Sequence, residues 1–154
     1  MKSRRIQGFT LIELVVVITI LGILAAFAIP KFVALDTQAR ISTIKGLAGS
    51  VKSAAALARS MAMASNTTVS VVMEGATVNL LNDYPDATAT GIALAVNANT
   101  AAGGDFIFAP GGAVATWTKV GAPTPATCEV TYTPAAVTAN GVTPPVVATN
   151  TAGC

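Results

Sequence analysis

The chain has 154 residues, of which 53% are hydrophobic and only 10% charged, and it contains no histidine. Soluble domains usually carry about 25% charged residues, so this composition argues against an ordinary cytosolic surface, and the hydrophobic content excludes disorder driven by net charge. Without histidine, Ser-His-Asp and Cys-His catalysis and most zinc sites are excluded. The net charge of +2 hides a polarity, because residues 1–59 sum to +6 and residues 60–154 to −4.

The first predicted element is an apolar helix that follows a short basic segment. Between Phe9 and Ile29 the only charged residue is Glu13. A helix of this length spans roughly 30 Å, the thickness of the hydrocarbon core of a bilayer. Residues 1–8 carry three basic side chains and no acidic one. The positive-inside rule therefore keeps this end in the cytoplasm and predicts that everything after Pro30 is exported.

Two simpler interpretations of the apolar segment are a cleaved secretory signal and a plain single-span anchor. Residues 26–28 (Ala-Phe-Ala) offer a signal-peptidase pattern, but the apolar run is longer than the about 7–15 residues of a typical signal, and Pro30 follows at once. Neither interpretation explains Glu13. An acidic residue inside a membrane span costs about 2.5–3.5 kcal/mol at the helix centre, less near its edge, and usually has a function.

Residues 8–30, GFTLIELVVVITILGILAAFAIP, closely resemble the class III signal and N-terminal helix of type IV pilins and type II secretion pseudopilins. The resemblance implies that a prepilin peptidase cuts between Gly8 and Phe9 and also N-methylates Phe9. The apolar helix then stays on the mature protein, whose net charge falls from +2 to −1 because three basic residues leave with the leader.

Cleavage gives a physical reason for Glu13. It creates a cationic amine on Phe9, and neither that amine nor the Glu13 carboxylate is stable alone in a membrane or filament core. Pairing Glu13 of an incoming subunit with Phe9 of its neighbour removes both penalties and fixes the axial register between apolar helices. We therefore expect Glu13 to act in assembly rather than in catalysis.

Residues 31–64 are predicted to continue the helix as an amphipathic segment, because apolar residues recur there at steps of three, four or five. Four basic residues lie on one slowly drifting face: Lys31, Lys45, Lys52 and Arg59. This face is either solvated or contacts the acidic heads of neighbouring subunits.

Four helix-weakening residues in this long helix call for an explanation. Gly46 and Gly49 are costly in a helix interior and predict close packing against a sheet. Gly22 and Pro30 weaken the helix further towards its start. The pilin resemblance implies that the stretch between Gly22 and Pro30 loses helicity in the filament.

Beyond residue 64 the composition shifts to Thr, Val, Gly and Pro, which predicts a β-rich head over residues 65–154. Strands are expected at residues 68–73, 76–81, 105–109, 114–119 and 128–133. Glu74-Gly75 is a two-residue hairpin candidate, and residues 88–97 are expected to form a short helix. The predicted fold class is α+β, with one antiparallel sheet packed on the exported half of the helix, as in the pilin fold.

Cys128 and Cys154 both fall in the exported part, where a cysteine pair most often forms a disulfide. The bond encloses 25 residues that show little strand pattern beyond residue 133. It contributes roughly 3.5 kcal/mol on the loop-entropy model. The segment resembles the disulfide-bounded C-terminal region of type IV pilins, and major pseudopilins usually lack such a pair. Redox catalysis is disfavoured because there is no C-x-x-C spacing.

The sequence offers few other candidates for binding or catalytic sites. Asp83, Asp86 and Asp105 are candidate calcium ligands, but they lack the dense alternation of an EF-hand loop, so no metal site and no cofactor are assigned. An acidic head argues against nucleic-acid binding.

A finer resemblance, to the type IVa-like mannose-sensitive haemagglutinin pilins, rests on residues 30–60, on YPDATATGIA and CEVTYT, and on the terminal Gly-Cys. It implies a major subunit of a surface pilus used in attachment.

The sequence therefore predicts a structural protein, not an enzyme, with four parts: a leader (1–8), a transmembrane and filament-core helix (9–30), an amphipathic continuation (31–64) and a head (65–154). The implied partners are further copies of the chain, the prepilin peptidase/methyltransferase, the inner membrane, an assembly platform and a motor ATPase. The expected location is the inner membrane with a periplasmic head, and then an extracellular filament. The alternatives are a type II secretion pseudopilin in a short periplasmic filament and a membrane-tethered exported enzyme or binding module.

Overall fold

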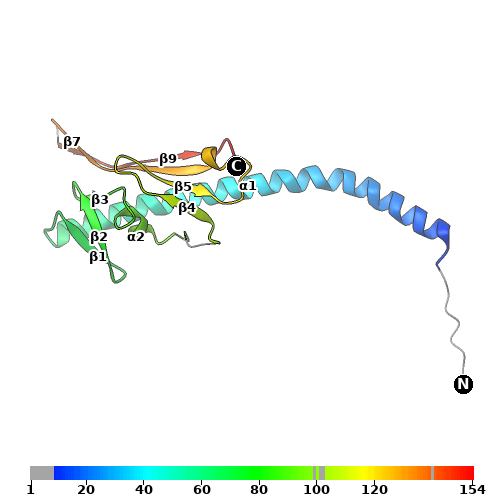
Figure 1. Cartoon of the computed structure of the whole chain (residues 1–154), viewed down its shortest axis with the longest axis horizontal. Coiled ribbons are helices and arrows are strands. Elements are labelled where there is room, and N and C mark those ends of the chain that lie inside the picture. The colour runs from blue at the N-terminus through cyan, green and yellow to red at the C-terminus, as the bar shows by residue number, and fades with distance from the viewer. Residues whose placement is uncertain (1–8, 99, 101–102, 140) are drawn as a thin grey trace, which may run out of the picture. The chain divides into compact units, whose positions relative to one another are not determined.

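The computed structural model describes residues 9–98, 100, 103–139 and 141–154. One long helix is followed by a series of short strands (Figure 1). The chain divides after Thr37 into two units, Met1–Thr37 and Gln38–Cys154, which we call the N-terminal unit and the C-terminal unit.

Helix α1 runs from Leu11 to Ala64 and covers both predicted helical segments. Pro30 lies inside it, where its ring removes one backbone N–H from the helical ladder. By length and composition α1 contains a window apolar enough to cross a membrane, and no residue of that window is buried. The predicted apolar helix is therefore present.

Among its described residues, the C-terminal unit adds two short helices and nine strands to its part of α1. The helices are α2 (Ile92–Val96) and the 3-10 helix η1 (Pro125–Thr127). The strands are β1 (Ser70–Met73), β2 (Ala76–Leu81), β3 (Tyr84–Pro85), β4 (Phe106–Ala109), β5 (Ala115–Lys119), β6 (Glu129–Thr133), β7 (Ala136–Thr138), β8 (Gly141–Thr143) and β9 (Val146–Asn150). All five predicted strands are found, four of them one or two residues shorter than expected, and the predicted short helix at residues 88–97 is found over Ile92–Val96.

The strands form three antiparallel sheets, so the expectation of one sheet was wrong. Their orders are β1-β2-β3, β4-β5-β6-β9 and β7-β8. The strands themselves follow from local alternation of side chains. Their grouping depends on which distant strands pair, and α2 with the loop after it separates β3 from β4 along the chain. The helix and antiparallel sheets together confirm the α+β fold class.

Two tight turns build the first sheet. Glu74 and Gly75 have φ angles of 49° and 81°, the left-handed pair that a two-residue hairpin turn requires, so the predicted hairpin is confirmed. Asn82 and Asp83, with φ of 54° and 68°, turn the chain from β2 into β3 in the same way.

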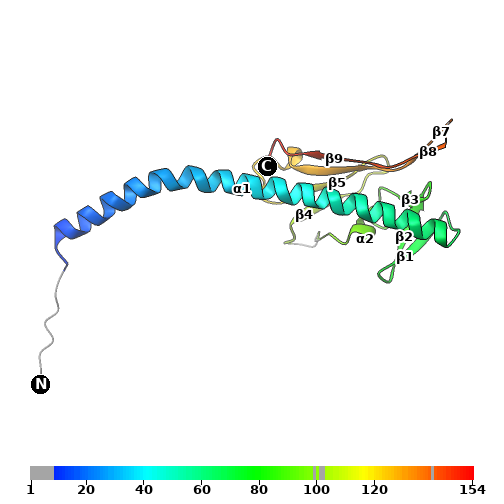
Figure 2. The ribbon, with the colours of Figure 1, turned by 180° about the vertical axis from the view of Figure 1, so that it is seen from behind.

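The core of the C-terminal unit lies between α1 and the sheets (Figure 2). The helix contributes Ile44, Leu47 and Val51 from its predicted apolar stripe. From the four-stranded sheet, Trp117 is fully buried and its ring lies 4.9 Å from that of Phe108, centroid to centroid. A second cluster joins Ala58 and Ala62 of α1 to the β1-β2 hairpin. The C-terminal part of α1 thus packs on antiparallel sheets, as predicted.

Two further expectations are corrected. Gly46 and Gly49 were predicted to pack closely against a sheet, but both are exposed, and a Cβ added to either would meet nothing within 4 Å. The segment after residue 133 was expected to hold little strand, yet it contains β7, β8 and β9. Its short strands are interrupted by Pro134, Pro144 and Pro145, which hide the alternation.

Candidate functional site

The start of α1 is organised by a reciprocal contact between Thr10 and Glu13. The backbone N–H and the hydroxyl of Thr10 both donate to Glu13 Oε2, at 2.9 and 2.8 Å, and the Glu13 N–H lies 3.3 Å from Thr10 Oγ1. This is a capping box, in which the side chains at the N-cap and at the third helical position satisfy each other's free N–H groups. Sequence reasoning singled out Glu13 but missed Thr10, although the T-x-x-E spacing is the signal for this motif.

Glu13 stands on an apolar surface. Together with Phe9, Ile12, Val16 and Val17 it lines a shallow recess of about 330 Å³. Phe9 is 79% exposed, and none of residues 9–37 is buried. A carboxylate here is therefore surrounded by side chains that gain free energy when another apolar surface covers them.

The other predicted site residues of this unit are Gly8, Gly22 and Pro30. Gly8 falls outside the described residues, so the structure does not describe the predicted cleavage bond. Gly22 and Pro30 are both helical. The loss of helicity between them concerns the filament and stays a prediction.

The two cysteines form the predicted disulfide in the C-terminal unit. The Cα atoms of Cys128 and Cys154 lie 4.9 Å apart, and both residues are buried. The bond connects the start of β6 to the residues after β9, two strands that already pair in the four-stranded sheet. It therefore closes a segment that includes the exposed β7-β8 hairpin.

The residues around this disulfide are closely packed. The Gly153 N–H donates to the Thr127 carbonyl at 3.0 Å, and the Gly153 carbonyl accepts from the Thr124 N–H at 3.1 Å. A Cβ at Gly153 would lie 2.1 Å from Thr127 Oγ1 and 2.3 Å from Thr124 O, so only glycine fits. Arg40 of α1 donates to the Cys154 carbonyl at 2.9 Å.

The predicted basic face of the helix divides in two. Lys31, Lys45 and Lys52 are exposed. Arg59 instead lies over the ring of Tyr84, with its guanidinium carbon 4.7 Å from the ring centroid, and also donates to the Tyr84 hydroxyl. Arg59 is thus part of the internal structure of the unit.

A buried tyrosine lies close to this contact. The Tyr132 hydroxyl donates to Pro85 O at 2.6 Å and is buried. Burial, with a smaller contribution from the charge of Asp86, raises the pKa of Tyr132 well above its ordinary value.

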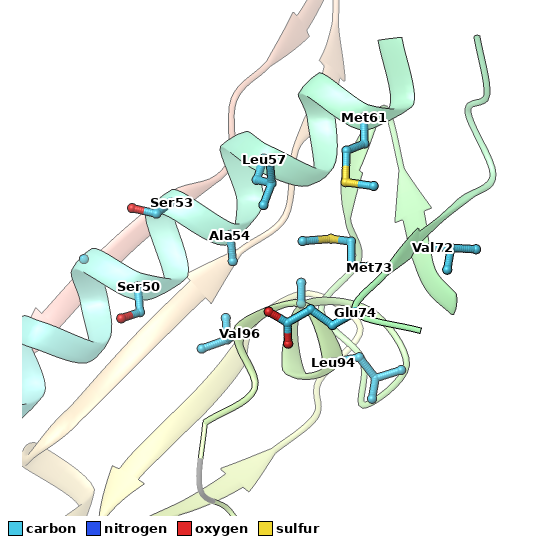
Figure 3. Close-up of a pocket in the computed structure, with 12 residues that line it drawn as sticks. Ser50, Ser53, Ala54, Leu57, Met61, Val72, Met73, Glu74, Leu94 and Val96 are labelled. Carbon is cyan, nitrogen blue, oxygen red and sulfur yellow. The ribbon is translucent and has the colours of Figure 1, made fainter. Parts of the chain in front are cut away.

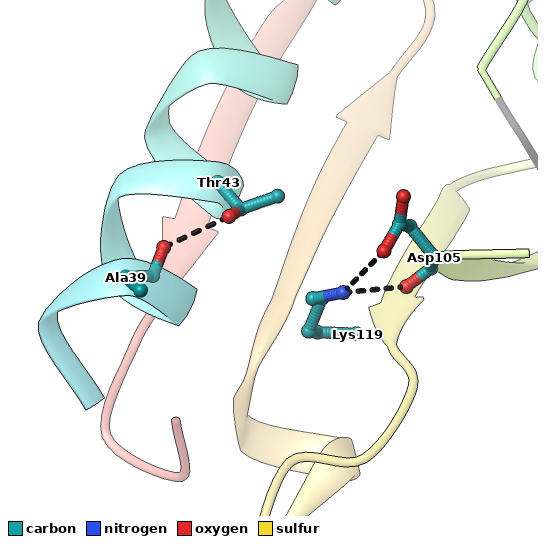
Figure 4. Close-up of polar contacts among 4 residues, drawn as sticks. All are labelled: Ala39, Thr43, Asp105 and Lys119. Atoms are coloured by element: carbon teal, nitrogen blue, oxygen red, sulfur yellow. Dashed lines mark hydrogen bonds and ion pairs between the residues drawn. The ribbon is translucent and has the colours of Figure 1, made fainter. Parts of the chain in front are cut away.

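Two of the three acidic residues considered as cation ligands, Asp105 and Asp86, make hydrogen bonds within the chain. Asp105 accepts from Lys119 Nζ at 2.9 Å, close to the part of α1 that carries the Thr43–Ala39 hydrogen bond (Figure 4). Asp86 accepts from the backbone N–H of Thr88 at 3.1 Å. Within the described residues no group of three or more His, Cys, Asp or Glu side chains could hold a metal ion.

Comparison with known proteins locates the resemblance. Residues 3–29 match the family model described as the prokaryotic N-terminal methylation motif. The chain is 52% identical over 54 residues to the type IV narrow pilus major component PilA5 of Thermus thermophilus, covering 35% of this chain and 47% of that protein. It is 43% identical over 54 residues to the type IV major fimbrial protein FimA of Dichelobacter nodosus, covering 35% of this chain and 34% of FimA.

A relative from a different system matches as well. The chain is 48% identical over 46 residues to the type II secretion system core protein G of Pseudomonas aeruginosa, covering 30% of this chain and 32% of that protein. These matches confirm the resemblance to type IV pilins. The chain spans less than half the length of these relatives, and no solved structure gives a significant match.

Proposed function

We propose that this chain is the structural subunit of a type IV pilus, cut between Gly8 and Phe9, N-methylated on Phe9 and polymerised through α1 into a surface filament for attachment. The observation that carries the proposal is Glu13, the single charged group on an exposed apolar helix start that matches the N-terminal methylation motif. The pilus names of two relatives support it.

Assembly rests on the Glu13 carboxylate. Before assembly its charge is stabilised within its own chain by the N–H and hydroxyl of Thr10. A carboxylate accepts up to about four hydrogen bonds, so these contacts leave capacity for the Phe9 amine of a neighbouring subunit. The ion pair forms only when the two helices stand at one axial offset, and it therefore selects the filament register.

The same proposal sets location and partners. The apolar part of α1 first lies in the inner membrane, with the leader in the cytoplasm and the head in the periplasm. A prepilin peptidase/methyltransferase processes the chain there. Filament formation exchanges lipid contacts for helix contacts with little net gain, so an assembly platform and a motor ATPase are needed to drive it.

The second candidate is a type II secretion pseudopilin, favoured by the match to core protein G. It shares the processing and the helix but makes only a short periplasmic filament. The buried Cys128–Cys154 bond favours the pilin, because major pseudopilins usually lack it. A membrane-tethered exported enzyme or binding module would need neither Glu13 nor polymerisation.

Two measurements test the proposal. Electron microscopy of material sheared from the cell surface is expected to show long filaments made of this chain. Mass spectrometry is expected to find methylated Phe9 as the mature N-terminus. Methylated Phe9 without surface filaments at native expression indicates the pseudopilin, whereas a mature chain that begins at Ile29 indicates an ordinary signal and refutes both.

A further inference from the structure

The C-terminal unit has a groove of about 610 Å³ between α1, the β1-β2 hairpin and α2 (Figure 3). Its lining mixes apolar side chains with the hydroxyls of Ser50 and Ser53 and with the carboxylate of Glu74. Two methionines, Met61 of α1 and Met73 of β1, line it as well. The groove therefore combines polarisable sulfur atoms with a negative charge.

The two methionines come from different elements and are held in place by packing. Met73 is only 8% exposed and belongs to the buried cluster that also contains Ala58 and Ala62 of α1. Met61 is half-buried and packs against the same cluster. Both side chains reach the groove, and Figure 3 shows them pointing toward one another. Their thioether sulfurs are thus positioned together by the folded chain itself.

Thioether sulfur selects soft metal ions. Methionine ligands favour Cu(I), and the chemically similar Ag(I), over Mg²⁺ and Ca²⁺, which prefer oxygen. The chain offers few rival soft ligands, because it has no histidine and its two cysteines form the buried disulfide. Met1 falls outside the described residues, and Met63 is 62% exposed and does not line the groove. Among the described residues, the groove is therefore where two soft ligands meet.

Glu74 supplies a charge of the sign that a metal cation needs. It is the one charged side chain among the described residues that line the groove, and its φ of 49° lies in the left-handed region. A hairpin turn of this type favours Asn, Asp or Gly, so glutamate there costs backbone free energy. Backbone strain of this kind clusters at binding sites. A carboxylate in the same groove as the two sulfurs offsets the charge of a bound monovalent ion.

We propose that Met61 and Met73 bind a soft monovalent metal ion, Cu(I) or Ag(I), through their thioether sulfurs, with Glu74 as the compensating charge. The inference does not depend on the proposed function, because it concerns the C-terminal unit of a single copy. A bound ion links the last turns of α1 to the β1-β2 hairpin. It stabilises the folded unit, since a ligand that binds only the folded state shifts the equilibrium away from unfolding.

Silver titration of the full-length chain in detergent tests the site. Ag(I) is the probe because it needs no reductant that would break the Cys128–Cys154 bond, and the buffer is free of chloride, which precipitates silver. Calorimetry is expected to show one tightly bound Ag(I) per chain. Met61→Leu and Met73→Leu nearly conserve side-chain volume, so the fold is kept. Each removes one of the two sulfur ligands and is expected to weaken binding roughly tenfold or more.

The matched control is Met63→Leu, which removes an exposed sulfur outside the groove and is expected to bind Ag(I) as the wild type does. Glu74→Gln removes the charge but no sulfur, so it should weaken binding by only about two- to fivefold. Formation of the disulfide, seen by non-reducing electrophoresis, checks that every variant folds.

Three results would overturn the site: no Ag(I) bound to the wild-type chain, wild-type affinity in Met61→Leu or Met73→Leu, or an equal loss in Met63→Leu. A larger loss in Glu74→Gln than in the methionine variants would also overturn it, because the ion would then be held by oxygen rather than by sulfur.

Discussion

The two units of this chain use their apolar side chains in opposite ways. In the C-terminal unit the large side chains Trp117, Tyr132 and Ile92 are fully buried, and the sheets enclose one face of α1. In the N-terminal unit no described residue is buried, and Phe9, Leu11 and Ile12 are each at least 70% exposed.

This difference shows where each unit obtains its stability. The C-terminal unit has its own core, which is fixed by the disulfide and by the Arg40–Cys154 contact. The N-terminal unit gains free energy only when lipid or other protein covers it. Substitutions in the first should therefore change folding, and substitutions in the second should change location and assembly.

The largest expected effect separates the units directly. In the proposed filament, Glu13→Ala leaves the Phe9 amine without its partner. Breaking a buried ion pair costs about 3–5 kcal/mol, so filament yield should fall by roughly a hundredfold or more. Membrane insertion and urea unfolding of the C-terminal unit should not change. Thr10→Ala is the matched control, because it removes the helix cap but keeps the Glu13 carboxylate. It should retain more filament than Glu13→Ala. Abundant filament from Glu13→Ala would contradict the role given to this residue.

The next effect is confined to the C-terminal unit. Replacing both Cys128 and Cys154 by serine removes a 25-residue loop constraint and should lower the free energy of unfolding by roughly 3.5 kcal/mol. Urea titration of the full chain in detergent, followed by circular dichroism, measures it. Adding reductant to the wild-type chain should cause the same loss of unfolding free energy. The helical circular dichroism signal of the N-terminal unit should persist.

Two glycines of the C-terminal unit are expected to respond with opposite signs. Gly153→Ala drives a methyl group into Thr124 and Thr127 and should destabilise by about 1–3 kcal/mol. Gly49→Ala has open space and a better helix propensity, so it should stabilise by about 0.4–1 kcal/mol. Thermal unfolding of the two variants and the wild type measures both changes in stability. If both variants were stabilised, or both destabilised, the packing described at these glycines would be contradicted.

The smallest effect depends on pH. Burial raises the folded-state pKa of Tyr132, so its contribution to stability is fully present below about pH 10, the ordinary tyrosine value, and is lost as pH rises above it. Tyr132→Phe lacks this ionisation and should lose stability less steeply between pH 9 and about pH 11. Urea midpoints at the two pH values measure the slopes. Parallel slopes would show that Tyr132 ionises equally in both states.

The sequence was most informative where the pattern is local. The apolar helix, the Glu74-Gly75 turn and the strands around Trp117 all follow from composition and periodicity. The division into three sheets did not follow, because pairing depends on distant strands. The strands β7–β9 were missed because prolines interrupt their alternation, and the packing expected at Gly46 and Gly49 was wrong because a helical glycine carries no sign of what faces it. Thr10 could have been found from its spacing to Glu13.

The position of Trp117 gives the molecule a built-in optical reporter. It is the one tryptophan of the chain, it is fully buried, and its ring lies against Phe108 in the four-stranded sheet. Its fluorescence therefore reports on the C-terminal unit alone and does not respond directly to events at the N-terminal helix. If the chain polymerises as proposed, a change of emission on assembly would mean that contacts between subunits alter the interior of the C-terminal unit. A constant spectrum would mean that this unit joins the filament as a rigid body.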